Sequence, residues 1–180
     1  VVHATAPLAR AAARYPLRDA RTVLVCGGGP SGLLFVQVLR AVLGYAGRLL
    51  VAEPNARKRA LAERFGAETI DPSAEDVGAA VRERTGGRRA EVLIDAAGSA
   101  AVFAAIPGML RKQGTVMLYG HGHTGADIGL INGVQFLEPT LLAPTGASGG
   151  FETDGRPSTY VRALRMIESG RVDAASMITH

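Results

Sequence analysis

VLVCGGGPSG, residues 23–32, decides the fold, and the apolar run Leu-Leu-Phe-Val follows it at residues 33–36. Four residues that favour β-structure stop at a cluster of glycines, and the pattern then changes from strand-like to helix-like. The stretch therefore predicts a strand that turns sharply into a helix. Its spacing, Gly27-x-Gly29-x-x-Gly32, is typical of a turn that binds a dinucleotide.

Each glycine has a physical reason in that interpretation. Gly27 lets the chain leave the strand in a tight turn, and Gly29 has no side chain to keep a pyrophosphate from the backbone. Gly32 allows the helix to pack close to the strand. Pro30 and Ser31 lie in the first helical turn, where proline loses no needed donor and where N–H groups and the helix dipole attract phosphate.

A second strand is predicted at residues 48–53 and ends in Glu53, 21 positions after Gly32. That is close to the roughly 20 residues expected for the acid that binds the adenosine ribose hydroxyls. A carboxylate there favours NAD and repels the 2′-phosphate of NADP. Arg57, one turn into the next helix, could reach such a phosphate or could lie in solvent. We therefore expect NAD, with NADP as the alternative.

Composition excludes several classes of protein. The chain has 180 residues, enough for one domain with a sizeable core, and its 47% hydrophobic and 20% charged residues are ordinary for a globular protein. The net charge of +4 is spread over short basic runs flanked by acids, so we expect no nucleic-acid partner. No stretch resembles a membrane span or a signal peptide, which predicts a cytoplasmic protein. The single cysteine, Cys26, leaves no cysteine-based zinc site and is expected to be a small buried residue.

The remaining chain alternates between strand-like and helix-like segments. Further strands are predicted at residues 68–71, 90–95, 114–120 and 139–143, and helices near 5–14, 33–43, 57–65, 102–110, 132–137 and 158–169. We expect residues 73–76 to open a helix as a capping box, and Val161, Leu164 and Ile167 to face inward from the last helix. The alternation predicts a doubly wound α/β fold with a six-stranded parallel sheet in the order 3-2-1-4-5-6.

With these motifs in place, the chain resembles the coenzyme-binding domain of the zinc-type medium-chain dehydrogenase/reductase superfamily, which includes alcohol, sorbitol and threonine dehydrogenases. The resemblance covers essentially the whole chain. It rests on the ordered motifs at residues 25–32, 53–67, 92–99, 114–120 and 167–180.

The resemblance implies a role for several residues. Gly27, Gly29, Gly32 and Glu53 would hold the adenosine half of the cofactor, and the backbone at Ala97-Gly98 and Tyr119-Gly120 would meet the nicotinamide half. The family's catalytic zinc and its Cys, His and acidic ligands belong to another domain, so no metal ligand or catalytic residue is assigned here. The whole chain, residues 1–180, is then expected to be the NAD(P)-binding domain of a longer two-domain protein, with residues 1–20 as a leading helix and connection.

The predicted function is hydride transfer between nicotinamide and a small alcohol or polyol substrate, in a homo-oligomer of undetermined size. Two alternatives are an NAD-sensing regulatory module without catalysis and a methyltransferase of similar fold. His121 and His123 follow the fifth strand in the ligand-side loop and could bind metal, line the crevice or lie in solvent. Asp95, at the end of the fourth strand, is expected to be a turn or cap carboxylate. The glycines at residues 146–150 could approach a ligand closely or form a mobile turn.

Overall fold

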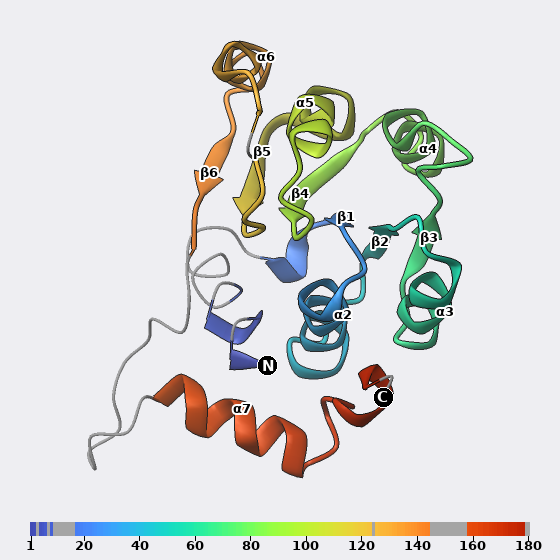
Figure 1. Ribbon diagram of the computed structural model, residues 1–180, viewed down its shortest axis with the longest axis vertical. Helices are drawn as coiled ribbons and strands as arrows, with labels where there is room; N and C mark the ends of the chain where they lie inside the picture. The colour runs from blue at the N-terminus through green and yellow to red at the C-terminus, as the bar shows by residue number, and fades with distance from the viewer. Residues whose placement is uncertain (3, 7, 9–16, 124, 145–157, 179–180) are drawn as a thin grey trace.

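A six-stranded parallel sheet forms the centre of the protein (Figure 1). The computed structural model describes residues 1–2, 4–6, 8, 17–123, 125–144 and 158–178. The strand order is β3-β2-β1-β4-β5-β6, and every neighbouring pair is parallel. This confirms the predicted α/β fold and its order 3-2-1-4-5-6. The strands span Thr22–Cys26 (β1), Arg48–Ala52 (β2), Glu68–Ile70 (β3), Ala90–Asp95 (β4), Leu110–Leu118 (β5) and Thr140–Leu142 (β6).

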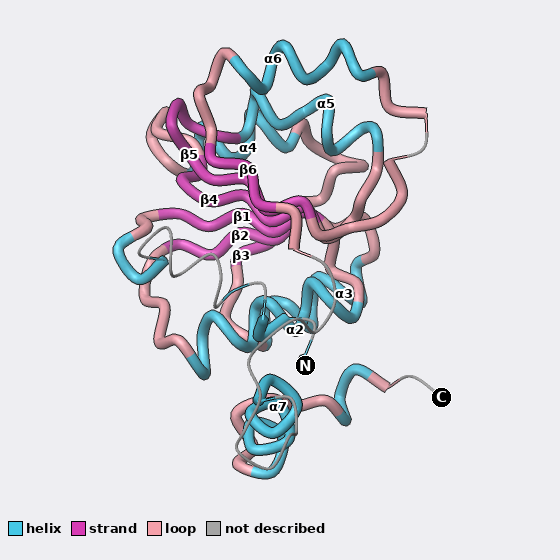
Figure 2. Tube along the Cα trace, turned by 90° about the vertical axis from the view of Figure 1, so that its left-hand side faces the viewer, coloured by secondary structure: helices cyan, strands magenta, loops and turns pink. Residues whose placement is uncertain are grey.

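Helices cover both faces of the sheet (Figure 2). One face carries α2 (Pro30–Gln37), which continues as a π-helical turn over Val38–Val42, and α3 (Ala56–Arg64). The other face carries α4 (Val77–Arg84), α5 (Ala100–Met109) and α6 (Ile131–Gln135), and α7 (Ser158–Glu168) lies beyond α2. Three short 3₁₀ segments complete the described elements: Leu17–Asp19, Ile128–Leu130 and Ala175–Met177.

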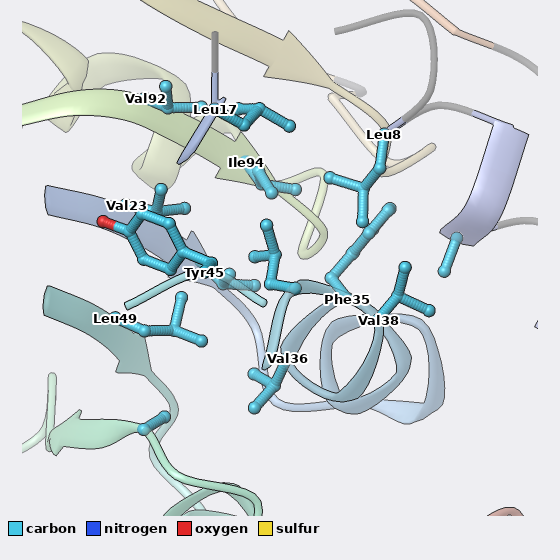
Figure 3. Close-up of a cluster of buried hydrophobic side chains, with 14 of the residues drawn as sticks. Leu8, Leu17, Val23, Phe35, Val36, Val38, Tyr45, Leu49, Val92 and Ile94 are labelled. Atoms are coloured by element: carbon cyan, nitrogen blue, oxygen red, sulfur yellow. The ribbon is translucent and has the colours of Figure 1, made fainter. Parts of the chain in front are cut away.

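The central strand is apolar on both sides because both of its faces are covered. Val23 and Val25 belong to the core cluster under α2, which also holds Phe35 (Figure 3), whereas Leu24 and Cys26 belong to the cluster under α4 and α5. Alternate residues of a strand point to opposite faces, so an unbroken apolar run is what a doubly covered strand requires. Each fully buried Val or Leu contributes about 1.5–3 kcal/mol relative to an exposed one.

The start of α4 differs from the prediction. Asp76, not Ser73, is the N-cap residue, and its side chain accepts from the Ala79 N–H. Ser73 instead donates its backbone N–H and its hydroxyl to Asp71 Oδ1, in the turn that follows β3. The predicted capping box at residues 73–76 was wrong because two nearby aspartates can each form a cap or turn. Asp71 is the nearer acceptor for Ser73, and Asp76 caps the helix.

The inward face of α7 was also predicted wrongly. Thr159 and Ala163 are buried, whereas Leu164 and Ile167 are 59% and 42% exposed. Met166 completes the inner face by packing against the cluster under α2, while Val161 is half-buried. Two sets of residues recur along α7 at helical spacing. The set that includes Thr159 and Ala163 has the smaller side chains, which permit the closer approach to the core.

Strand β5 begins four residues earlier than predicted and ends two residues earlier. Leu110 pairs with Ala90 directly after α5, and the register then shifts before Thr115 pairs with Val92. Gln113, within the irregular stretch, has a φ of 57°.

Pro107 lies inside α5. The helix α6 and the 3₁₀ turn that precedes it confirm the short helix expected after β5.

Two predicted features fall outside the described residues. They are most of the helix expected near residues 5–14 and the glycine-rich turn at 146–150. Among the helices that the structure describes, none has the length and apolar character needed to span a membrane.

Candidate functional site

The turn between β1 and α2 is built almost without side-chain volume. Gly27 has a φ of +102°, and a Cβ atom there would lie 3.0 Å from Ala97 N. A Cβ at Gly32 would lie 1.9 Å from Gly27 O, so the helix touches the turn through bare backbone. A Cβ at Gly29, by contrast, would meet nothing within 4 Å. The turn is therefore tightly packed behind Gly27 and Gly32 and open above Gly29.

The N-terminus of α2 faces this open corner. Gly29 is the N-cap residue and Pro30 occupies the first turn. Leu33 N–H donates to Gly29 O at 2.9 Å, so the N–H groups of Ser31 and Gly32 precede the first intrahelical bond. Such groups, together with the positive end of the helix dipole, form a site that attracts an anion.

Glu53 lies at the same corner, directly after β2. Its side chain is only 6% exposed, and Oε2 accepts from Gly28 N–H at 2.7 Å. Oε1 accepts from Asn55 N–H at 2.9 Å. A Cβ at Gly28 would lie 2.9 Å from the Glu53 Cγ atom. The carboxylate therefore contacts the glycine turn from the neighbouring strand, as the spacing of 21 residues predicted.

A cavity of about 570 Å³ opens beside Gly29 and Glu53. Its walls are mostly apolar and come from the ends of several elements, among them Pro72, Val77 and Val102. Lys58, in the first turn of α3, lines it next to Glu53. An apolar slot that ends in a carboxylate and an ammonium group has the chemistry to take a planar heteroaromatic ring joined to a polyhydroxyl sugar.

Arg57 does not line the cavity that Glu53 lines. It is exposed and lines a neighbouring cavity of about 290 Å³, which Pro30 and Met177 also border. The two cavities adjoin, because Lys58 lines both of them and Gly28 of the glycine turn borders the one that Arg57 lines.

The turns after β4 and β5 meet one another through glycine. A Cβ at Gly98 would lie 2.5 Å from the Gly120 carbonyl carbon, and a Cβ at Gly120 would lie 2.3 Å from Gly98 N. Ala97 is exposed and lines the 570 Å³ cavity. The Tyr119 ring packs edge-on against Phe35 with centroids 5.0 Å apart, so its side chain belongs to the core. The two glycines of these turns present bare backbone at this edge.

Asp95 and His123 form a pair that neither position suggested alone. Asp95 is fully buried at the end of β4, and His123 Nε2 lies 2.8 Å from its Oδ2 atom. Asp95 Oδ1 accepts from the N–H groups of Ala97 and Gly98, which confirms the expected turn carboxylate. His121 is exposed. No group of three or more His, Cys, Asp or Glu residues that could hold a metal ion occurs in the described part of the chain.

Cys26 is buried at the end of β1, as expected. Burial raises the pKa of its thiol well above the ordinary value, and the charge of Asp95 raises that pKa further. The thiol is therefore neutral at physiological pH and is not a nucleophile.

The structure thus brings most of the predicted residues to one edge of the sheet. Gly27, Gly29, Pro30, Ser31, Gly32 and Glu53 surround one corner, and Ala97, Gly98, Tyr119 and Gly120 lie at the tips of the two strands beyond it. Arg57 borders the adjoining cavity. Sequence reasoning missed Lys58 and the apolar walls of the cavity. The signal for Lys58 was its position in the first turn of the helix that follows Glu53, whereas the walls come from segments that only the fold brings together.

Comparison with known proteins identifies this arrangement. The sequence profile of the family described as zinc-binding dehydrogenase matches residues 30–169. L-galactonate-5-dehydrogenase of Escherichia coli K12 is 30% identical over 174 residues, which cover 96% of this chain and 47% of that protein. L-threonine 3-dehydrogenase of Pyrococcus horikoshii is 29% identical, over 89% of this chain and 44% of its own length. The chain therefore spans about half the length of these curated relatives.

Solved structures agree with the sequence matches. A candidate zinc-binding dehydrogenase from Sinorhizobium meliloti 1021, solved with NADP bound, superposes with a TM-score of 0.79 and 26% identity, over 99% of this chain and 49% of that one. 2R,3R-butanediol dehydrogenase of Bacillus subtilis gives a TM-score of 0.74 and 25% identity, over 99% of this chain and 47% of that one. These relatives favour the dehydrogenase prediction over a methyltransferase or a purely regulatory module.

Proposed function

The chain belongs to the zinc-binding dehydrogenase family, and from that premise we propose that it is the part of an alcohol, polyol or amino-alcohol dehydrogenase that binds and orients the nicotinamide cofactor. The observation that carries the proposal is the open space above Gly29, with the carboxylate of Glu53 at its side. A diphosphate needs a side-chain-free approach to backbone N–H groups, and the adjoining ribose needs a fixed acceptor for its hydroxyls.

The adenosine half of the cofactor would occupy the 570 Å³ cavity. The N–H groups of Ser31 and Gly32 would face the pyrophosphate at the start of α2. Glu53 would accept from the ribose hydroxyls, because its two hydrogen bonds to backbone N–H groups use only part of the acceptor capacity of a carboxylate. Lys58 lines the same cavity.

The nicotinamide half would lie over the turns after β4 and β5. Gly98, Tyr119 and Gly120 present backbone there, and Ala97 borders both this surface and the 570 Å³ cavity, so the ring would be held by main-chain groups and by contact with the glycine surface. When bound, the nicotinamide supplies or accepts the hydride exchanged with the substrate's carbinol carbon. The residues of this chain orient the cofactor and take no part in the proton transfer.

We propose NAD as the cofactor in preference to NADP. Glu53 is buried and held by two backbone N–H groups, so it cannot move away from a 2′-phosphate placed beside it. Bringing that dianion against a fixed carboxylate is unfavourable. Arg57 lines the adjoining cavity and forms no hydrogen bond or ion pair with Glu53 among the described residues. The NADP bound to the Sinorhizobium relative belongs to that protein and leaves the preference here to be measured.

The catalytic zinc that the family's description implies is proposed to lie outside this chain, together with the substrate pocket. The described residues offer no cluster of three metal-ligating side chains, so no step through zinc is assigned to them. A small alcohol or polyol substrate, a homo-oligomeric assembly and a cytoplasmic location remain predictions.

Fluorescence or calorimetric titration of the 180-residue chain with NADH and with NADPH tests the proposal. We expect saturable NADH binding, weaker NADPH binding and no oxidation of alcohols by the chain alone. In Glu53→Gln the preference for NADH should fall by about tenfold, because the repulsive charge is removed at nearly constant shape. Tighter binding of NADPH by the unmodified chain would refute the NAD assignment, and failure to bind either nucleotide would refute the function.

A further inference from the structure

Asp95 is the common partner of the two turns at the nicotinamide end of the site. Its side-chain Oδ1 accepts from Ala97 N–H at 3.1 Å and from Gly98 N–H at 2.8 Å. Its backbone carbonyl accepts from Tyr119 N–H at 3.0 Å and from Gly120 N–H at 2.8 Å. One buried residue therefore receives a hydrogen bond from each of the four positions assigned to the nicotinamide half.

These bonds leave the two turns little freedom to move separately. The glycines of the turns approach so closely that a Cβ on either one would lie within 2.5 Å of the other's backbone. A displacement of the Asp95 side chain would move the first turn, and the first turn presses directly on the second. The orientation of Asp95 thus sets the shape of the surface on which the nicotinamide would lie.

His123 fixes the remaining carboxylate oxygen. Its Nε2 atom lies 2.8 Å from Oδ2, and since an ionised carboxylate only accepts, the histidine donates. The imidazole is 28% exposed, whereas Asp95 is fully buried, so the histidine covers the carboxylate on its solvent side. Phe103 holds the ring from α5, edge-on, with centroids 6.0 Å apart. A buried carboxylate oxygen without this donor would lack a partner or admit water, at a free-energy cost.

We propose that His123 is a positioning residue, which holds Asp95 and through it the two turns that receive the nicotinamide half of the cofactor. The proposal rests on the function proposed above. It goes further by assigning to a loop residue a selective effect on one half of the ligand. The adenosine half is assigned to the glycine corner, where Glu53 and the start of α2 form no hydrogen bond with His123 among the described residues.

Two ligands and three variants separate this role from a general effect on folding. NADH contains the nicotinamide and ADP-ribose lacks it, while both share the adenosine and the pyrophosphate. His123→Phe keeps a ring against Phe103 and removes the donor. His123→Gln places an amide N–H near the position of Nε2 and serves as the matched control. His123→Asn is a second loss-of-contact variant, because its side chain is too short to reach Oδ2.

For His123→Phe we expect NADH binding to weaken by about tenfold, the loss expected for one hydrogen bond to a buried charge. ADP-ribose affinity should stay within about twofold of the unmodified chain, and His123→Gln should restore most of the NADH affinity. If the Phe variant does not fold, the Asn variant should show the same selective loss.

Equal losses for both ligands, or unchanged NADH binding without the donor, would overturn the positioning role while the proposed function stands. If the unmodified chain binds neither NADH nor ADP-ribose, the proposed function fails and this inference fails with it.

Discussion

Substituting Gly29 by alanine should weaken cofactor binding and leave the fold intact. The backbone at Gly29 has φ −67° and ψ −177°, which any residue adopts without strain. The new methyl group would meet no protein atom within 4 Å. It would instead occupy the space proposed for the pyrophosphate, between the ligand and the backbone N–H groups of α2.

The stability change works out close to zero. Replacing glycine by alanine restricts the unfolded chain and stabilises by about 0.4–1 kcal/mol. Alanine is a poorer N-cap than glycine, which costs about 0.5–1 kcal/mol and offsets that gain. Binding behaves differently, since losing one hydrogen bond to a charged group costs about 1.5–3 kcal/mol. The expected loss of NADH affinity is therefore about 10- to 100-fold.

Gly32→Ala provides the contrast within the same motif. Its Cβ would lie 1.9 Å from Gly27 O, a backbone atom that cannot move without opening the turn. Overpacking of this kind costs about 1–3 kcal/mol or more, and one kcal/mol lowers the melting temperature of a domain of this size by about 2–4 °C. Gly108→Ala, whose Cβ would meet only Arg82 Nη1 and Gly78 Cα at 3.9 Å, controls for the substitution itself.

The assay combines thermal unfolding with NADH titration on the four proteins. We expect Gly29→Ala to melt with the unmodified chain and bind weakly, Gly32→Ala to melt earlier, and Gly108→Ala to bind normally. NADH binding by Gly29→Ala at full strength would refute the placement of the pyrophosphate. A melting temperature as low as that of Gly32→Ala would refute the claim that the space above Gly29 is open.

Three further predictions concern groups that are not proposed to bind the cofactor. Because burial and Asp95 raise the pKa of the Cys26 thiol, iodoacetamide should not modify it in the folded chain at pH 8 but should do so in denaturant; rapid labelling of the folded chain would contradict this. Gln37 is buried and exchanges hydrogen bonds with the Asp173 backbone, so Gln37→Ala should destabilise by about 1–3 kcal/mol in urea unfolding, whereas the exposed Gln135→Ala should be neutral. Hydrogen bonds from Ser176, followed by the charge of Arg64, lower the pKa of Asp173. The contribution of Asp173 to stability should therefore be present above about pH 4 and be lost as the pH falls through its folded pKa. If the stability of an Asp173→Asn variant declines as steeply in acid as that of the unmodified chain, this prediction is wrong.

The sequence predicted the fold and the glycine corner because both depend on local patterns. A sheet covered on both faces requires unbroken apolar strands such as β1, β2 and β4. The sharp turn from strand to helix requires the glycines that follow β1. The distance from Gly32 to Glu53 is likewise set by one helix and one strand. These features need no knowledge of what lies across the molecule.

The features that were missed depend on contacts between distant segments. Asp95 and His123 are 28 residues apart, and nothing in either sequence context specifies that one side chain covers the other. The wrong face of α7 has the same origin, because its two sets of residues have equal periodicity and only the closeness of approach to α2 decides which is buried. The periodicity of a helix predicts which residues share a face, but it does not predict which part of the protein that face packs against.

Two buried carboxylates now account for the shape of the proposed cofactor surface. The Glu53 carboxylate accepts hydrogen bonds from the N–H groups of Gly28 and Asn55, and the Asp95 carboxylate accepts them from the N–H groups of Ala97 and Gly98. A buried backbone donor without a partner is costly, and each carboxylate supplies the acceptor for two N–H groups of the turns beside it. A carboxylate that satisfies these donors fixes the turn and leaves the remaining donors directed outward. On this argument, Glu53 and Asp95 each fix one of the turns proposed to receive opposite halves of the ligand, and Glu53 is proposed to contact the ligand as well.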